Sequence, residues 1–314
     1  VGMSGALSAG LVLAAGARAS AQEFPAAAGL LDLCRAAFAH VTPDTFWTAW
    51  SLAPQSLAPL LVVLAAYLSG AAAPRGAAHP VPAPRAACFM LGWTLLAIAL
   101  LSPLCRMSAG LASAHMVQHA ILAALAPPLL ILGSVGRVTA AGLPRAWGAA
   151  ADRALASAAG VQRRFGAYAA VTVLYGAAIW AWHAPAVYEA VLQSSTAHVV
   201  GYAGLIAISL AFWSGTVSLG TSGGAGAGAA VLGLLITTIH TGFLGALLTL
   251  SPFQWFASAT GGPAWGLTPL EDQQLAGLVM WVPMAGIFLA GTLWILYRAI
   301  DAFQQDGSPG LRPS

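Results

Sequence analysis

The chain has 314 residues, of which 59% are hydrophobic and only 7% are charged. A soluble domain carries about 25% charged residues, so this composition excludes an ordinary soluble protein and predicts a polytopic protein of the lipid bilayer. All twelve basic residues are arginine, and the formal net charge is +3. No basic run and no alternation of basic and aromatic residues is present, so no nucleic-acid partner is expected.

Residues 1–21 have the pattern of a signal peptide, because a short apolar segment is followed by small residues at 19–21 of the kind that signal peptidase recognises. No arginine precedes the apolar part, and an uncleaved additional segment is the alternative. Residues 22–54 are less hydrophobic and contain Trp47 and Trp50 near their end. This pattern predicts a periplasmic arm with an aromatic anchor at the membrane interface.

Seven apolar segments follow, each near the roughly 20 residues needed to span a bilayer. They predict an all-α transmembrane bundle of about seven helices over residues 55–300, with a tail over 301–314. Pro127, Pro128 and Pro283 remove backbone donors and are expected to kink their helices. The expected spans are 55–70, 86–104, 112–134, 166–183, 198–217, 229–250 and 274–298.

Most arginines fall on one side of this predicted bundle, and the positive-inside rule makes that side cytoplasmic. The amino-terminal arm is then outside the cytoplasm and the carboxyl tail inside. The nine arginines of the twelve that define this side are Arg75, Arg85, Arg137, Arg145, Arg153, Arg163, Arg164, Arg298 and Arg312.

The segment 112–134 contains the sequence HMVQH, in which His115 and His119 are four residues apart. On a helix this spacing places both imidazoles on one face, one turn apart, which suits chelation of a metal or stacking beside a cofactor. The alternative is a pair of ordinary polar residues at a helix end. Ionisable groups in membrane spans are costly and tend to mark function, which favours the metal site.

Further candidate ligands are predicted at the same depth, on the outer side of the bundle. His183 ends the segment 166–183, His198 begins the segment 198–217, and Glu271 and Asp272 precede the last segment. Imidazoles with a carboxylate make sites for copper, zinc or iron, and a carboxylate can also orient the ligand rings.

Three methionines add soft thioethers, namely Met116 within HMVQH and the pair Met280 and Met284, one turn apart in 274–298. That mixture favours Cu(I) over a hard cation, although methionine in a membrane helix is more often a packing residue. His240 lies in the middle of the segment 229–250. It either hydrogen-bonds across the bundle interior or is a deeper ligand on a metal path.

Several sequence blocks carry a family resemblance that extends over the chain from about Thr45. They are WTAW at 47–50, HMVQH with APPLL at 126–130, WHAP at 182–185 with Tyr188, LGALLT at 244–249, and PLEDQQLAG at 269–277 running into MWVP at 280–283. These blocks resemble the caa3-type cytochrome c oxidase assembly factors called CtaG. The resemblance implies a multispanning protein of the bacterial inner membrane that is needed to make active haem-copper oxidase.

The same resemblance implies the partner and the cargo, since a role in supplying copper to the oxidase catalytic subunit is often proposed for this family. One block departs from the family pattern. Where a His-x-x-Glu-His cluster is expected, this chain has His198-Val199-Val200-Gly201-Tyr202. The loss of the glutamate and of the second histidine indicates weaker metal binding, a different metal or a divergent subgroup.

Three functions are compatible with these patterns, and the leading one is a non-catalytic assembly factor that holds or passes copper at the periplasmic face. The second is a haem-carrying electron-transfer protein, because histidines on neighbouring helices can ligate haem. His115 and His119 share a helix face and cannot both be axial ligands of one haem, although either could pair with His183 or His198. Haem is the less favoured cofactor. The third is an oxidase scaffold without metal. No nucleophile triad, phosphate loop or carboxylate pair indicates an enzyme.

Overall fold

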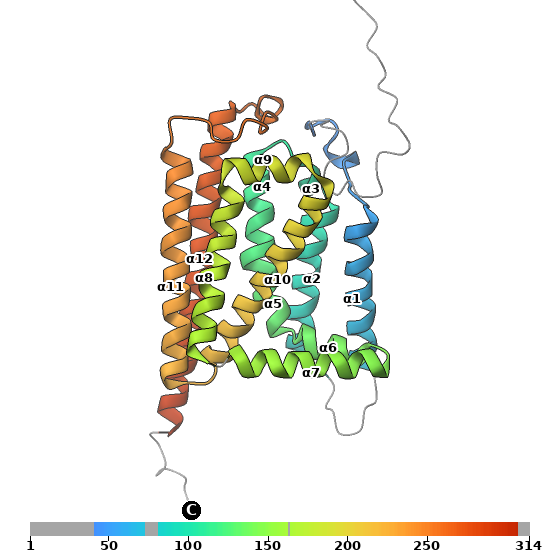
Figure 1. Cartoon of the computed structure of the whole chain (residues 1–314), viewed down its shortest axis with the longest axis vertical. Coiled ribbons are helices and arrows are strands. Elements are labelled where there is room, and N and C mark those ends of the chain that lie inside the picture. The colour runs from blue at the N-terminus through green and yellow to red at the C-terminus, as the bar shows by residue number, and fades with distance from the viewer. Residues whose placement is uncertain (1–40, 73–80, 163, 307–314) are drawn as a thin grey trace, which may run out of the picture.

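The computed structural model describes residues 41–72, 81–162 and 164–306, and the ordered secondary structure within these ranges is helical. The predicted signal peptide, most of the predicted arm and the last eight residues of the predicted tail lie outside them. Long helices run side by side in a bundle, and short helices cross its two ends (Figure 1). The prediction of an all-α membrane protein is therefore confirmed in its class.

Six helical segments within the described ranges are long and apolar enough to cross a membrane. A seventh, α8 (Phe165–His183), qualifies only together with α7 (Arg145–Gln162), from which it is bent by 100°. The count is thus six, or up to seven if this bent pair is one span. The six are α1 (Pro54–Ala72), α2 (Ala83–Leu101), the segment Ala112–Leu132, α10 (Ser195–Gly220), α11 (Gly224–Leu250) and α12 (Pro269–Asp306).

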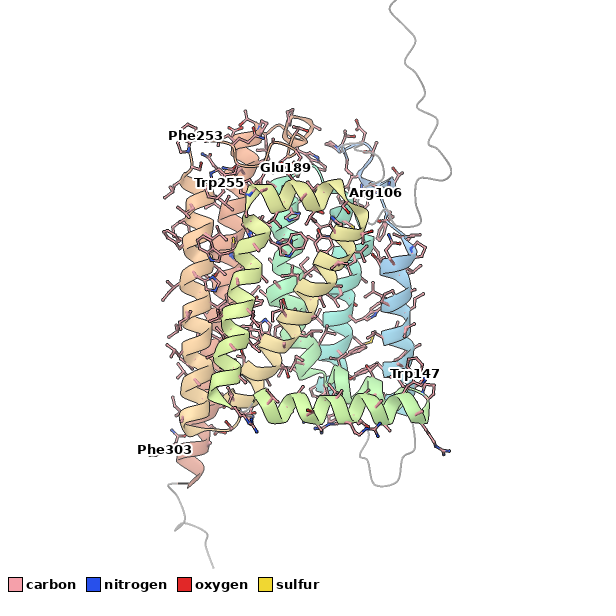
Figure 2. All side chains as sticks on the ribbon, viewed as in Figure 1. Arg106, Trp147, Glu189, Phe253, Trp255 and Phe303 are labelled. Carbon is pink, nitrogen blue, oxygen red and sulfur yellow. The ribbon has the colours of Figure 1, made fainter. Side chains whose placement is uncertain are left out.

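One end of the bundle is crossed by α7, which runs roughly perpendicular to the long helices (Figure 1). The sequence predicts only an arginine-bearing connection here, but the chain forms α6 (Val135–Gly142) and then α7. Trp147 of α7 is 73% exposed and lies at this end (Figure 2). An exposed tryptophan on a helix that lies across the bundle end is typical of a helix in the membrane interface.

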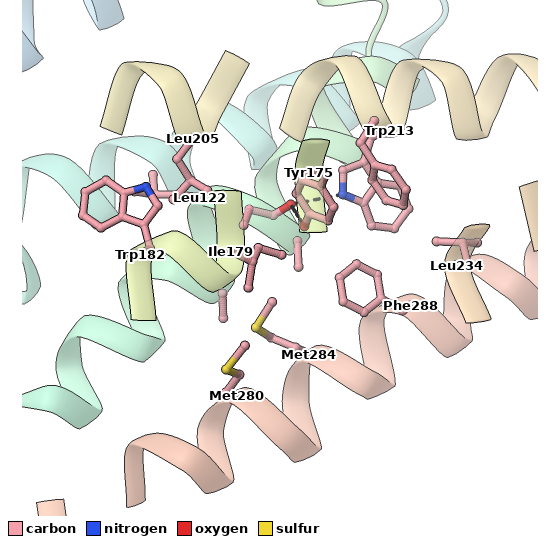
Figure 3. Close-up of a cluster of buried hydrophobic side chains, with 14 of the residues drawn as sticks. Leu122, Tyr175, Ile179, Trp182, Leu205, Trp213, Leu234, Met280, Met284 and Phe288 are labelled. Carbon is pink, nitrogen blue, oxygen red and sulfur yellow. Dashed lines mark hydrogen bonds between the residues drawn. The ribbon is translucent and has the colours of Figure 1, made fainter. Parts of the chain in front are cut away.

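The third span is interrupted at its centre, where the π-helical segment η3 (Ala120–Leu125) separates α4 (Ala112–His119) from α5 (Ala126–Leu132). The carbonyl of Ala123 can use neither its α-helical nor its π-helical partner, since these are Pro127 and Pro128, which have no N–H. Tyr175 Oη and Trp213 Nε1 donate to this carbonyl instead, at 3.0 and 3.1 Å (Figure 3). The predicted distortion is therefore stabilised by donors from α8 and α10, as a bilayer requires.

The last span is longer than expected. Pro283 lies inside α12, and the helix continues through it. α12 also continues to Asp306, so the first residues of the predicted tail are helical. It packs closely on α11, where a Cβ added to Gly245 would lie 2.9 Å from the carbonyl oxygen of Gly277. Such small residues allow two membrane helices to approach at backbone distance.

The two ends of the bundle differ in charge. Arg85, Arg137, Arg145, Arg153, Arg164 and Arg298 lie on the elements that meet at the α7 end (Figure 1). Among the described residues, Arg106 of α3 (Pro103–Met107) is the arginine at the opposite end (Figure 2). The ends of α4, α8 and α10 that carry histidines meet at this opposite end, together with α9 (Pro185–Gln193).

This charge distribution predicts the orientation in the membrane. A reporter that is active only outside the cytoplasm should be active when inserted in the connection between α11 and α12, and silent when fused after α12, because arginines are retained on the cytoplasmic side. Enzyme activity in whole cells and protease protection in spheroplasts measure this. The reverse pattern would put the histidine end in the cytoplasm.

Candidate metal centre

His115 and His119 lie on one face of α4, as their spacing predicts. Their ring centroids are 4.1 Å apart, and the side chains are only 1% and 5% exposed. His119 Nε2 has no hydrogen-bond partner within the described residues, and the ring nitrogens of His115 make no hydrogen bond of standard geometry there, although the backbone of Ser108 lies close to His115. Buried polar atoms are nearly always paired, so this pair is a candidate for a ligand that the apolar core does not supply.

His183, at the end of α8, contacts both its own helix and α4. Its Nδ1 lies 2.7 Å from the carbonyl oxygen of Ile179, and its Nε2 lies 3.1 Å from Met116 Sδ. A carbonyl only accepts hydrogen bonds, so Nδ1 carries the proton, and in the neutral imidazole Nε2 then presents a lone pair. The thioether sulfur also presents lone pairs. Two Lewis bases therefore face each other with no proton between them.

Aromatic rings enclose these imidazoles. Trp182 lies edge-on to His119 at a centroid distance of 5.1 Å, and Tyr188 of α9 lies edge-on to His115 at 5.0 Å. Tyr202 of α10 stacks on Trp182 at 5.4 Å. The Tyr188 hydroxyl is buried without a partner within the described residues, and burial raises the pKa of Tyr188. Tyr188 is a site residue that the search for metal ligands missed, although the resemblance contained it.

Gln118 links these aromatic rings to the neighbouring helices by hydrogen bonds, as a polar side chain within a membrane span can do. Its Nε2 donates to the carbonyl of Ala99 at 2.6 Å, and its Oε1 accepts from Tyr202 Oη at 2.5 Å. The Ala99 carbonyl needs this donor because its α-helical partner would be Pro103, which has no N–H. The amide thus connects the end of α2 with α10 through α4.

His198, near the start of α10, is also part of the cluster. Its side chain is 1% exposed, and its ring lies edge-on to Tyr202 at 4.5 Å. The departure from the family pattern, at Gly201 and at Tyr202, has a packing explanation. A Cβ added to Gly201 would lie 2.5 Å from the Trp182 indole, so a glutamate cannot occupy this position while Trp182 packs there.

Asp272 is buried at the start of α12, but both its oxygens bind backbone. Oδ2 accepts from the N–H of Ala112 at 2.6 Å, and Oδ1 accepts from the N–H of Ser113 at 3.1 Å and from the Ser113 hydroxyl. Asp272 therefore caps the amino terminus of α4, where a negative charge is favourable. This contact positions the helix that carries His115, Met116 and His119.

Glu271 is exposed and lies in a capping box with Thr268. Its carboxylate accepts from the Thr268 N–H at 2.7 Å, and the Thr268 hydroxyl accepts from the Glu271 N–H at 3.2 Å. The pattern Thr-Pro-Leu-Glu before an apolar run is a recognised signal for such a cap, and sequence reasoning missed it.

The remaining candidates are two methionines and His240. Met280 and Met284 pack one turn apart in the apolar core, with Ile179 near Met284 (Figure 3). His240 is half-buried on α11 and lines an apolar pocket of about 420 Å³ between α8 and α11. Neither of its ring nitrogens has a hydrogen-bond partner within the described residues, so the expected hydrogen bond across the bundle does not form there.

The cluster is not a preformed centre of many ligands. Among the residues that the structure describes, no group of three or more His, Cys, Asp or Glu side chains has the geometry to hold one metal ion. The arrangement combines buried imidazoles with one thioether at the end of the helical membrane bundle that is opposite the arginine-rich end. This defines a polytopic membrane protein with a buried cluster of imidazoles and one thioether, enclosed by aromatic rings.

The comparison with known families gives the particular assignment. The model of the cytochrome c oxidase caa3 assembly factor family, Caa3_CtaG, matches residues 23–302. The chain therefore belongs to this family of assembly factors, and the resemblance seen in its sequence blocks is confirmed. Comparisons with curated proteins and with solved structures found no match.

The two adjacent carboxylates should respond differently to neutralisation. Asp272→Asn turns an amide N–H toward the donors of α4 and should lower the free energy of unfolding by about 1–2 kcal/mol. Glu271→Gln, at the exposed capping box, should change it by less than about 0.5 kcal/mol. Thermal unfolding of the detergent-purified protein measures both. Equal unfolding midpoints for the two variants would contradict a capping role for Asp272.

Proposed function

We propose that this caa3 oxidase assembly factor binds Cu(I) between His183 and Met116 and delivers it to the catalytic subunit of a haem-copper oxidase. The observation that carries the proposal is the pair His183 Nε2 and Met116 Sδ, 3.1 Å apart. Two lone-pair donors at this distance gain little from each other and much from a soft cation between them. Imidazole with thioether is a ligand set suited to Cu(I).

His119 supplies a further nitrogen to the same ion, and His115 lies next to His119. The His119 ring centroid is 5.9 Å from that of His183, and that of His115 is 4.1 Å from His119. Cu(I) accepts fewer ligands than Zn²⁺ in a structural site does, so an incomplete shell is compatible with binding. An ion held by few ligands is also released easily, which suits a factor that passes its metal on. No catalytic step is involved, and the protein is not an enzyme.

Three observations support an extracytoplasmic location of this site in the bacterial inner membrane. The histidine end is opposite the arginine-rich end, which the positive-inside rule assigns to the cytoplasm. Cys105, on α3 at the histidine end, is disulfide-bonded, and disulfides persist in oxidising compartments. If the bent pair of α7 and α8 is counted as one span, the number of spans is up to seven, and an odd number puts the start of α1 and the end of α12 on opposite sides of the membrane.

Haem is a poorer occupant than copper. Neighbouring rings at the site have centroid distances between 4.1 and 6.2 Å, which is direct packing. Haem between His119 and His183 would have to displace Trp182, which lies edge-on to His119 and stacks on Tyr202. A scaffold without metal is the other alternative, and it leaves unexplained the buried Nε2 of His119, which has no hydrogen-bond partner within the described residues.

The thioether ligand gives a direct test, because Met116→Leu removes the sulfur at nearly constant volume. Cu(I) affinity should fall about tenfold or more, as even supporting residues of a metal site are worth about 10–100-fold. Competition with a Cu(I) chelator under reducing conditions measures it, and X-ray absorption should show the loss of copper–sulfur scattering. Met280→Leu is the matched control and should bind copper as the wild type does. Equal affinities of the two variants would refute the thioether ligand.

The cellular role gives a second test. Cells with His183→Ala as the only copy should contain the oxidase subunits and haems but lack oxidase copper and activity at limiting copper. Added copper should restore part of the activity. His240→Ala, a histidine outside the cluster, should leave activity unchanged. Full activity of the His183→Ala cells in copper-limited medium would rule out copper delivery through this site.

A further inference from the structure

A second cavity, of about 720 Å³, lies at the arginine-rich end, away from the imidazole cluster. Its wall comes from five parts of the fold, which are the start of α2, the α5–α6 corner, α7, and the ends of α10 and α12. The other four parts lie beside α7 at this end of the bundle (Figure 1). The cavity is therefore a product of tertiary packing and no single sequence segment encodes it.

Three arginines on three different helices line this cavity. They are Arg85 of α2, Arg137 of α6 and Arg298 of α12, and the described lining residues include no Asp or Glu. A positive-inside bias requires only that arginines lie on one side of the membrane. It does not require three of them to converge on one cavity, and Arg145, Arg153 and Arg164 at the same end are not among its lining residues.

The rest of the wall is mainly apolar, with Leu132, Leu155, Leu210 and Trp294 among its residues. The corner between α5 and α6, which forms part of this wall, has an unusual backbone conformation. Ser134 at this corner has a left-handed backbone with φ of 59°, which is uncommon for a residue other than glycine. An apolar wall below three cationic groups matches an amphiphile with acyl chains and an anionic head.

We propose that this cavity binds an anionic phospholipid, with its phosphate on the three arginines and its acyl chains against the apolar wall. Arginine pairs well with phosphate because its planar donors match the phosphate oxygens. Basic pockets between membrane helices on the cytoplasmic side are known to take such head groups. This inference is independent of the copper proposal, because it concerns the opposite end of the bundle.

The test uses the purified full-length chain in neutral detergent, titrated with phosphatidylglycerol, phosphatidylcholine and glycerol 1-phosphate. Native mass spectrometry counts the bound molecules. Phosphatidylglycerol should bind at least about tenfold more tightly than either of the others. Glycerol 1-phosphate binding as tightly would show a site for soluble phosphate, and phosphatidylcholine binding as tightly would show an acyl-chain groove without head-group recognition. Either result overturns the proposal.

Matched variants locate the site. The triple change Arg85→Gln, Arg137→Gln and Arg298→Gln should weaken phosphatidylglycerol binding about 100-fold, at about fivefold for each basic residue. The triple change Arg145→Gln, Arg153→Gln and Arg164→Gln removes the same charge from the same end and should leave binding within about threefold. Equal losses would show unspecific attraction and refute the pocket. If the first triple does not fold, Arg298→Gln against Arg164→Gln decides, with about a fivefold loss expected only for the former.

Discussion

The carboxylate of Asp272 at the amino terminus of α4 is the contact on which the site depends. It joins the start of the last span to the start of the third, through the N–H groups of Ala112 and Ser113. A helix end buried in an apolar surrounding needs such acceptors, since no water is available to its free N–H groups. The cap fixes where α4 begins and hence the depth of its histidines.

The orientation of the same segment depends on two carbonyls that prolines leave without partners. Pro103 deprives Ala99, and Pro127 and Pro128 deprive Ala123. Side chains from neighbouring helices supply the missing donors, with Gln118 at the first carbonyl and Tyr175 and Trp213 at the second. Because each donor comes from a different helix, satisfying these carbonyls also sets the rotation of the helices around the imidazole cluster.

The packing around α10 explains the departure from the family pattern at Gly201 and Tyr202. Tyr202 does not leave a gap where a histidine is expected, because its hydroxyl donates to Gln118 and its ring stacks on Trp182. Because Gly201 has no side chain, the indole of Trp182 can occupy the space beside it. At these two positions the chain thus has a packed aromatic wall, which lies close to the contact of His183 with Met116.

Patterns among residues that are close in the sequence predict much of this structure. Apolar length identifies the spans, arginine placement distinguishes the two ends, and the four-residue spacing places His115 and His119 on one face, because each depends only on residues close in the chain. The contact of Met116 with His183, the cap of Asp272 on α4, and the convergence of three arginines on one cavity depend on how separate helices rotate and pack. Asp272 illustrates the reason. A buried carboxylate is equally well paired by a metal or by a helix terminus, and only tertiary structure shows which of them lies within reach.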